Sequence, residues 1–198
     1  MIAVPLAMAL LGLAACSNNN YADVVRFHNS APISRGTLAV VASDPLVQQS
    51  LEFRTHAETV AIEMRRIGYT TGLPASQTQY VATIDISQAD AMGNVTRPGV
   101  TVGAGIGLPI GSNSGLGANV SVPVGRGSRR NPNMRSTTLA VQIRRNADQA
   151  IIWEGRAVKE ARVGEPGATA TGAVPQLANA LFREFPGTPG VTTQVRLN

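Results

Sequence analysis

The sequence has little cysteine, few aromatic residues and few charges. One cysteine in 198 residues excludes an intramolecular disulfide and a zinc site built on thiolates. Charged residues make up 15% of the chain and aromatic residues 4%. No Gly-x-Ser-x-Gly, His-Glu-x-x-His or phosphate-loop pattern occurs, so the common sequence signatures of hydrolases, zinc proteases and nucleotide-binding enzymes are absent. The hydrophobic fraction of 43% is nevertheless sufficient for a packed core, and the length fits one domain.

The N-terminal segment 2–15 is apolar and carries no charge. It is shorter than the roughly 20 residues that a membrane-spanning helix needs, and it fits the apolar region of a signal peptide. The residues that follow, Leu13-Ala14-Ala15-Cys16, resemble the lipobox of bacterial lipoproteins. In that motif the cysteine is diacylated on sulfur, the leader is cut before it and the new amino group is acylated. The alternative is a buried core cysteine, but the only cysteine of the chain stands at this position.

The lipobox resemblance predicts both the organisation and the location of the chain. Residues 1–15 would be a cleaved leader, and 16–23 a lipidated cysteine with a polar tether. Residues 24–198 would form one domain. Three acyl chains, at about 0.8 kcal/mol per buried CH₂, give essentially permanent membrane attachment. Ser17 in place of Asp after the cysteine resembles outer-membrane sorting signals. We therefore expect a lipid-anchored protein at the outer membrane, facing the periplasm.

Apolar periodicity predicts the elements of this domain. Strands are expected at 24–27, 37–42, 80–87 and 191–197, with 37–42 central in the sheet because it is continuously apolar. A helix is expected to begin at Asp44-Pro45 and to stop at Gly68, and a second to begin at Pro175 and to stop at Pro186-Gly187. Residues 139–143 and 151–158 flank the turn 146–148 and predict a hairpin. Together they predict an α+β fold, with two helices on one face of a mostly antiparallel sheet.

A glycine-rich insertion at 93–127 interrupts this order. Apolar residues occupy every second position on both sides of a turn-rich centre, which is typical of a β-hairpin at 100–124. The pattern is compatible with three structures: a soluble hairpin packed on the domain or a partner, a mobile loop, or one hairpin of an oligomeric membrane β-barrel. The third would make the chain a pore or export subunit.

Four arginines in one run are the candidate polyanion contacts: Arg126, Arg129, Arg130 and Arg135. A basic run in a cytoplasmic protein would suggest nucleic acid. A lipid-anchored envelope protein does not meet chromosomal DNA, so lipopolysaccharide or anionic lipid is the expected polyanion, the alternative being a solvated charged loop.

Few residues are candidates for catalysis. Asp85 and Asp90 could form a carboxylate pair for acid–base hydrolysis of an envelope polymer, or be a sheet-surface residue and a turn residue. His28, His56 and the only tryptophan, Trp153, are expected to be structural, with Trp153 as a core anchor. No cofactor or metal site is expected.

The order of these elements resembles that of a known family, over most of the segment 24–185. The lipobox is followed by a helix that ends in RRIGY (65–69), a strand YVATIDI (80–86), the glycine-rich insertion and LAVQIRRNADQAIIWEGRA (139–157). This order resembles the bacterial lipoprotein family catalogued as domain of unknown function 4136. The resemblance implies an envelope location and an α+β fold, and it brings no catalytic residues. The expected function is a non-enzymatic binding or assembly accessory that contacts an envelope protein or lipid. A pore subunit and a polymer hydrolase are the alternatives.

Overall fold

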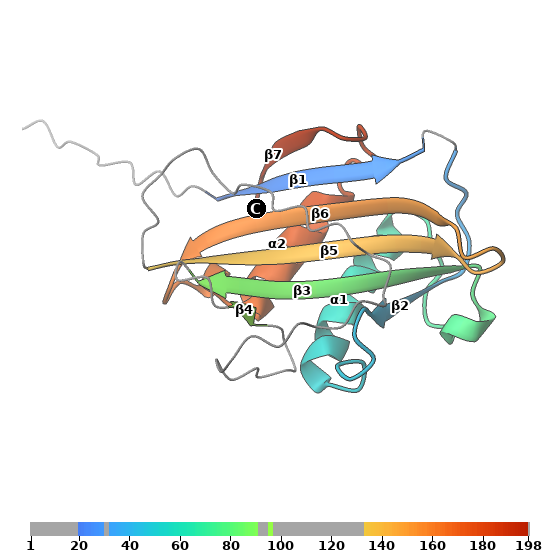
Figure 1. Cartoon of the computed structure of the whole chain (residues 1–198), viewed down its shortest axis with the longest axis horizontal. Helices are drawn as coiled ribbons and strands as arrows, with labels where there is room; N and C mark the ends of the chain where they lie inside the picture. Colours follow the sequence, from blue (N-terminus) through green and yellow to red (C-terminus); the bar gives the residue numbers. More distant parts are fainter. Residues whose placement is uncertain (1–19, 30–31, 91–94, 97–132, 198) are drawn as a thin grey trace, which may run out of the picture.

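A computed structural model describes residues 20–29, 32–90, 95–96 and 133–197 (Figure 1). The described elements are β1 (Tyr21–His28), β2 (Leu38–Ala42), α1 (Leu51–Arg66), η1 (Ala75–Gln77), β3 (Tyr80–Asp90), β4 (Val95–Thr96), β5 (Met134–Arg145), β6 (Ile151–Arg162), η2 (Pro166–Ala168), α2 (Ala170–Phe182) and β7 (Thr192–Arg196). The sheet order is β2-β3-β5-β6-β1-β7, with β4 beside β3. Only the pair β2–β3 is parallel among these strands.

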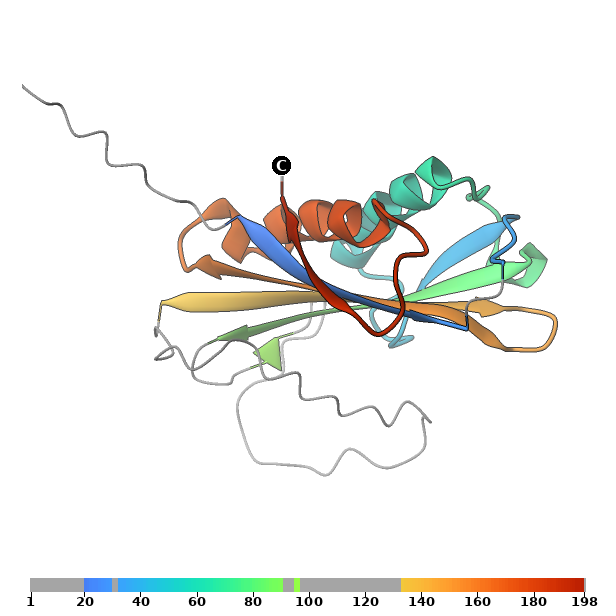
Figure 2. The ribbon, with the colours of Figure 1, turned by 90° about the horizontal axis from the view of Figure 1, so that it is seen from above.

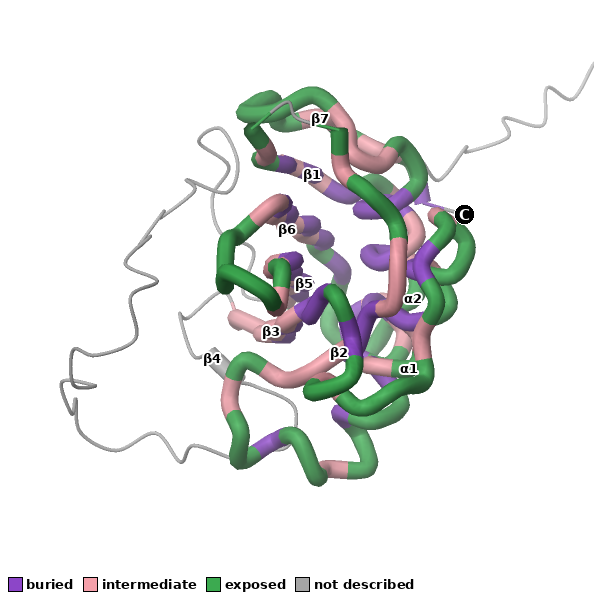
Figure 3. Tube along the Cα trace, turned by 90° about the vertical axis from the view of Figure 1, so that its right-hand side faces the viewer, coloured by how far each residue is buried: buried purple, intermediate pink, exposed green. Residues whose placement is uncertain are grey.

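Both helices pack on one face of this sheet (Figures 2 and 3). Their apolar sides and the alternate residues of the central strands, such as Leu139, Val141 and Ile143 of β5, form the core. The predicted α+β fold is therefore confirmed. No described helix is long and apolar enough to span a bilayer. The second face of the sheet, called the open face below, is covered by no described helix (Figure 2). By the alternation of β3 and β5 it carries small and polar residues such as Thr83, Asp85 and Gln142.

The strand β2 lies at an edge of the sheet, so the prediction that it is central is wrong. β2 is apolar although it is an edge strand, because Leu38 and Ala39 are buried there. Residues that belong to no strand form hydrogen bonds with part of the outer side of β2. Leu38 N donates to Thr70 O at 2.8 Å, and Ala42 N donates to the side chain of Gln48 at 2.6 Å. These bonds protect an edge that would otherwise accept a foreign strand.

The helix α1 begins later than its sequence pattern predicts. Asp44 and Pro45 start a turn, in which Asp44 accepts a hydrogen bond from Leu46 N at 2.9 Å. The cap is Ser50, whose Oγ accepts from Phe53 N. The predicted end is confirmed, because Gly68 adopts φ of 99°, a left-handed conformation that costs glycine little.

The helix α2 begins earlier than predicted. Thr169 caps it by accepting from Gly172 N at 3.1 Å, and Pro175 lies inside the helix instead of at its start. Pro175 is on the exposed side, while Val174 and Leu177 point into the core. The cap at Thr169 was not apparent in the sequence, because a proline is the stronger local start signal.

A buried arginine closes the C-terminal end of α2. Arg26 of β1 is 2% exposed, and it donates from Nε to Leu181 O and from Nη2 to Ala180 O, both at 2.9 Å. These carbonyls belong to the last turn, where helices leave acceptors unpaired and where the macrodipole favours a cation. Burial lowers the pKa of Arg26, and Glu184 acts in the opposite direction. These two hydrogen bonds hold the C-terminal end of α2 against β1.

The predicted hairpin is confirmed as β5 and β6, which are longer than expected. Trp153 at the start of β6 is fully buried, and its Nε1 donates to Pro186 O at 3.0 Å. Its ring lies 5.5 Å from that of Phe182 and 5.1 Å from that of Phe185. Trp153 is thus the predicted core anchor. The end of its ring lies over Gly155, where any side chain would collide with it.

Candidate binding site

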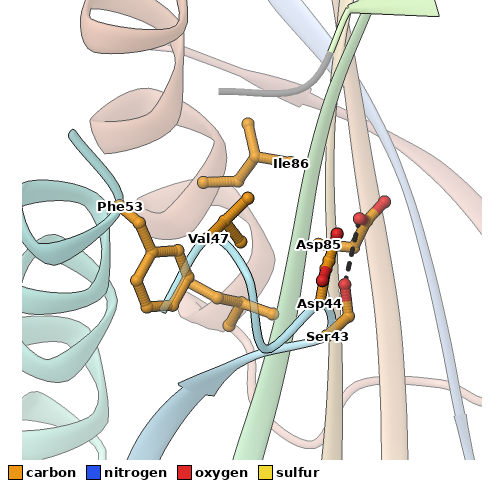
Figure 4. A pocket seen from close by; sticks show the side chains of 7 residues that line it. Ser43, Asp44, Val47, Phe53, Asp85 and Ile86 are labelled. Carbon is orange, nitrogen blue, oxygen red and sulfur yellow. Dashed lines mark hydrogen bonds between the residues drawn. The ribbon is translucent and has the colours of Figure 1, made fainter. Parts of the chain in front are cut away.

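A notch in the sheet edge lies beside β3. The pairing of β3 with β2 ends at Ala42 and Ile84, and its pairing with β4 begins at Gln88 and Thr96. Within the described residues, the segment 85–87 of β3 therefore has a strand neighbour on the β5 side alone. The turn that precedes α1 passes beside this gap (Figure 4).

The notch has an apolar floor and a polar rim. Its lining comprises Val47, Phe53, Ile84 and Ile86 on the apolar side and Ser43, Asp44 and Asp85 on the polar side (Figure 4). Ser43 Oγ donates to Asp85 Oδ1 at 3.1 Å, which joins the end of β2 to the open face of β3. The space is too small for a cofactor and has room for no more than the tip of one partner side chain.

Two exposed leucines lie close in sequence to residues that line the notch. Leu46 precedes Val47 of the floor and is 85% exposed, and Leu51 precedes Phe53 by two residues and is 77% exposed. Single exposed leucines are ordinary, but two strongly exposed leucines within six residues of one short segment make that segment a candidate contact surface. The carboxylates of Asp44 and Asp85 add negative charge at the rim. The notch and these leucines form the candidate binding site, suited to a partner with an apolar side chain and nearby hydrogen-bond donors.

The two candidate catalytic carboxylates do not meet. Asp85 lies on the open face of β3, whereas Asp90 lies five residues further on, on the opposite face and about 16 Å along the strand. Asp85 accepts from Ser43, and Asp90 pairs with Arg135 Nε at 2.9 Å. A shared acid–base site would need both groups around one substrate bond. The geometry does not form the pair that the hydrolase hypothesis requires.

Most other predicted site residues lie outside the described ranges. These are Cys16, the hairpin 100–124, and Arg126, Arg129 and Arg130. Arg135 is described, and its guanidinium is engaged with Asp90 across β3 and β5. The described residues contain no group of three or more potential metal ligands from His, Cys, Asp and Glu.

Both histidines lie in structural surroundings. His28 Nε2 is 2.9 Å from Gly187 O, near the end of β1. His56 of α1 is 2% exposed, and its Nε2 has no hydrogen-bond partner among the described residues. Burial lowers the pKa of His56, and Glu52, whose Oε1 is 3.7 Å away, acts in the opposite direction. His56 therefore packs as a neutral core residue at neutral pH.

This burial predicts acid sensitivity that can be traced to one residue. Below the unfolded-state pKa of about 6.5, the unfolded chain binds a proton at His56 that the folded chain does not, so the free energy of unfolding falls as pH decreases. The slope contributed by one such proton is at most about 1.4 kcal/mol per pH unit. Urea unfolding between neutral and mildly acidic pH should show a smaller loss of stability in His56→Leu than in the wild type. Equal slopes in the two proteins would refute the assignment.

A buried lysine was missed in the sequence. Lys159 of β6 is 7% exposed, and its Nζ donates to Asn20 Oδ1 at 2.8 Å and to Gln176 Oε1. Burial lowers the pKa of Lys159, with Glu165 acting against the shift. Leu197 N in turn donates to Asn20 O at 2.8 Å. Asn20 thus belongs to the folded domain, which begins earlier than the tether boundary at residue 23 predicts. Local sequence carries no signal for contacts so distant along the chain.

Comparisons with known proteins identify no function. No protein-family model matches the chain. It is similar to an uncharacterized protein of Zymomonas mobilis, with 29% identity over 212 residues that cover 88% of this chain and 80% of that protein. Two solved structures are distantly similar. The PelC dodecamer of Paraburkholderia phytofirmans has a TM-score of 0.40 and 7% identity over 79% of this chain and 91% of that one. A PDZ domain protein of Parabacteroides distasonis has a TM-score of 0.49 and 9% identity over 88% and 38% of the two chains. These similarities carry no inference about activity.

Proposed function

We propose that the chain is a lipid-anchored protein of the bacterial cell envelope, which acts at the periplasmic side of the outer membrane by binding a partner, without catalysis. The observation that carries the proposal is Cys16, the only cysteine, which directly follows an apolar leader and Leu13-Ala14-Ala15. The described domain starts at Asn20, so this cysteine stands just ahead of the folded part in sequence.

The geometry of the notch supports binding over catalysis. Asp85 and Asp90 are on opposite faces of β3, and both side chains already have protein partners. In contrast, Leu46 and Leu51 expose apolar area to solvent in the segment that also supplies Val47 and Phe53 to the notch. Burying both leucines in an interface would stabilise a complex by about 1.5–3 kcal/mol each. The expected partner is an envelope protein that inserts an apolar side chain.

A photo-crosslinking amino acid at Leu51 tests this surface in intact cells. We expect a discrete adduct from Leu51, because this side chain lies at the candidate interface. The matched control is Ile62, which is also exposed and lies on the same side of α1 about 16 Å along the helix. Ile62 should give no such adduct.

A second variant links the adduct to the notch. Leu46→Asp places a charge at the other exposed leucine, and it should abolish the Leu51 adduct while changing stability by no more than about 0.5 kcal/mol, because the site is exposed. Equal adducts from Leu51 and Ile62, or a Leu51 adduct that survives Leu46→Asp, would contradict binding at the notch.

A further inference from the structure

We propose that one end of the sheet rests on the lipid headgroups of the membrane that holds the anchor. This membrane-facing end comprises Tyr21, Arg162, Val163 and Arg196. The inference rests on the proposed function, because it requires acyl chains at Cys16, and it adds the orientation of the domain and the residues that touch lipid.

The strand pairing gathers these residues at one end. β1 begins at Tyr21, which is paired with Arg196 near the end of the antiparallel β7. β6 ends at Arg162, which is paired with Met134 at the start of β5. Val163 N then donates to Asn133 O at 2.7 Å, which fixes the turn beside the same strands. Figure 1 shows the start of β1 and the ends of β6 and β7 on the same side of the molecule.

The length of the link to Cys16 determines which end faces the membrane. Four residue steps separate Cys16 from Asn20, and a fully extended chain of that length spans at most about 14 Å. Asn20 is held to the domain by hydrogen bonds with Lys159 and Leu197, so it does not add to the length of the link. Acyl chains in the bilayer therefore bring the start of β1 to the headgroup region.

The exposed side chains at this end fit a headgroup surface. Tyr21 is 45% exposed and Val163 is 52% exposed. Tyrosine is favoured at membrane interfaces, where its ring contacts apolar groups and its hydroxyl contacts water. Arg162 and Arg196 are exposed and can donate hydrogen bonds to lipid phosphates. The four residues combine apolar contact with phosphate recognition.

Two carboxylates limit the strength of this contact. Glu160 and Glu165 are exposed near the same end, so its net charge is small. The end would then not attract an anionic membrane from a distance. The contact forms because the anchor holds the residues at high effective concentration beside the phosphates. The chain without lipid should therefore not bind vesicles, although the anchored chain should have a defined orientation.

Fluorescent labels at the two ends of β6 test the orientation. The lipidated full-length protein, processed in its host, is reconstituted in vesicles of phosphatidylethanolamine and phosphatidylglycerol that carry a headgroup quencher. Val163→Cys places a label at the membrane-facing end. Asp148→Cys places one in the exposed turn at the other end, about 35 Å away along β6. Acylated Cys16 does not react with the label.

The proposal predicts several-fold stronger quenching at Val163 than at Asp148. Adding Arg162→Glu and Arg196→Glu should reduce quenching at Val163, because the phosphate contacts are lost while the anchor remains. Equal quenching at both positions, or no effect of the arginine changes, would overturn the inference. Mass analysis of each labelled protein reports acylation of Cys16 separately. An acylated protein without preferential quenching refutes only the orientation, whereas an unmodified Cys16 refutes the proposed function itself.

Discussion

Replacement of Cys16 by serine is expected to move the protein from the membrane fraction to the soluble periplasmic fraction. The proposed thioether to glyceride needs a thiol, so the variant would have no acyl chain to hold the domain at the membrane. The apolar leader is itself a membrane-binding segment if it stays uncut, so Cys16→Ser is best made behind a leader that is removed independently of the cysteine. The wild type should be almost entirely in membranes, since several acyl chains bind essentially irreversibly. Cell fractionation measures the distribution.

A change at the next residue provides the matched control. Ser17→Asp keeps the thiol, so this variant should stay in the membrane fraction. Its sorting signal then resembles that of inner-membrane lipoproteins, so we expect it to move from the outer to the inner membrane. A membrane-bound Cys16→Ser chain behind the cleavable leader would show that attachment does not depend on this cysteine.

A methyl group at Gly155 is expected to destabilise the domain strongly. A Cβ at this position would overlap Trp153 at Cη2 and would lie 2.8 Å from Leu181 Cδ1. Both neighbours are fully buried, and the bond from Trp153 Nε1 to Pro186 O restrains the indole. Overpacking a core costs about 1–3 kcal/mol, and Gly155→Ala should lie in the upper part of that range. Urea unfolding measures the change.

A double-mutant cycle identifies the cause of this loss. Trp153→Phe removes the ring atoms Cη2 and Cζ2 that a Cβ at residue 155 would meet. Gly155→Ala should therefore cost less in the Trp153→Phe background than in the wild type. Val158→Ile adds a methylene on the open face of the same strand, where we expect a change within about 0.5 kcal/mol. Equal costs of Gly155→Ala in the two backgrounds would contradict the packing explanation.

The elements that sequence predicts well are those whose signals are local. The hairpin of β5 and β6 follows from alternating residues around one polar turn, and the end of α1 follows from Gly68. The predicted start of α1 is wrong because Asp44-Pro45 is a start signal for turns as well as for helices. The edge position of β2 could not be predicted from its own residues, because the groups that bond to its outer side, Thr70 and Gln48, come from other segments.

The candidate site was only partly accessible from sequence. Asp85 was a candidate, but the residue it contacts, Ser43, stands 42 positions earlier, so no spacing rule connects them. The separation of Asp85 from Asp90 could have been found, because an odd spacing within one strand places two side chains on opposite faces. The exposure of Leu46 could not be predicted from sequence, because its spacing fits the apolar side of a helix that begins at Pro45.

Intact-mass analysis of the protein from native membranes tests the lipid anchor most directly. We expect a chain that starts at Cys16, and a mass that exceeds that of residues 16–198 by a diacylglyceryl group and one further acyl group. Alkaline treatment should remove the ester-linked acyl chains and leave the thioether on the sulfur. A mass that corresponds to an uncut leader with a free thiol at Cys16 would contradict the anchor, and with it the orientation proposed for the sheet.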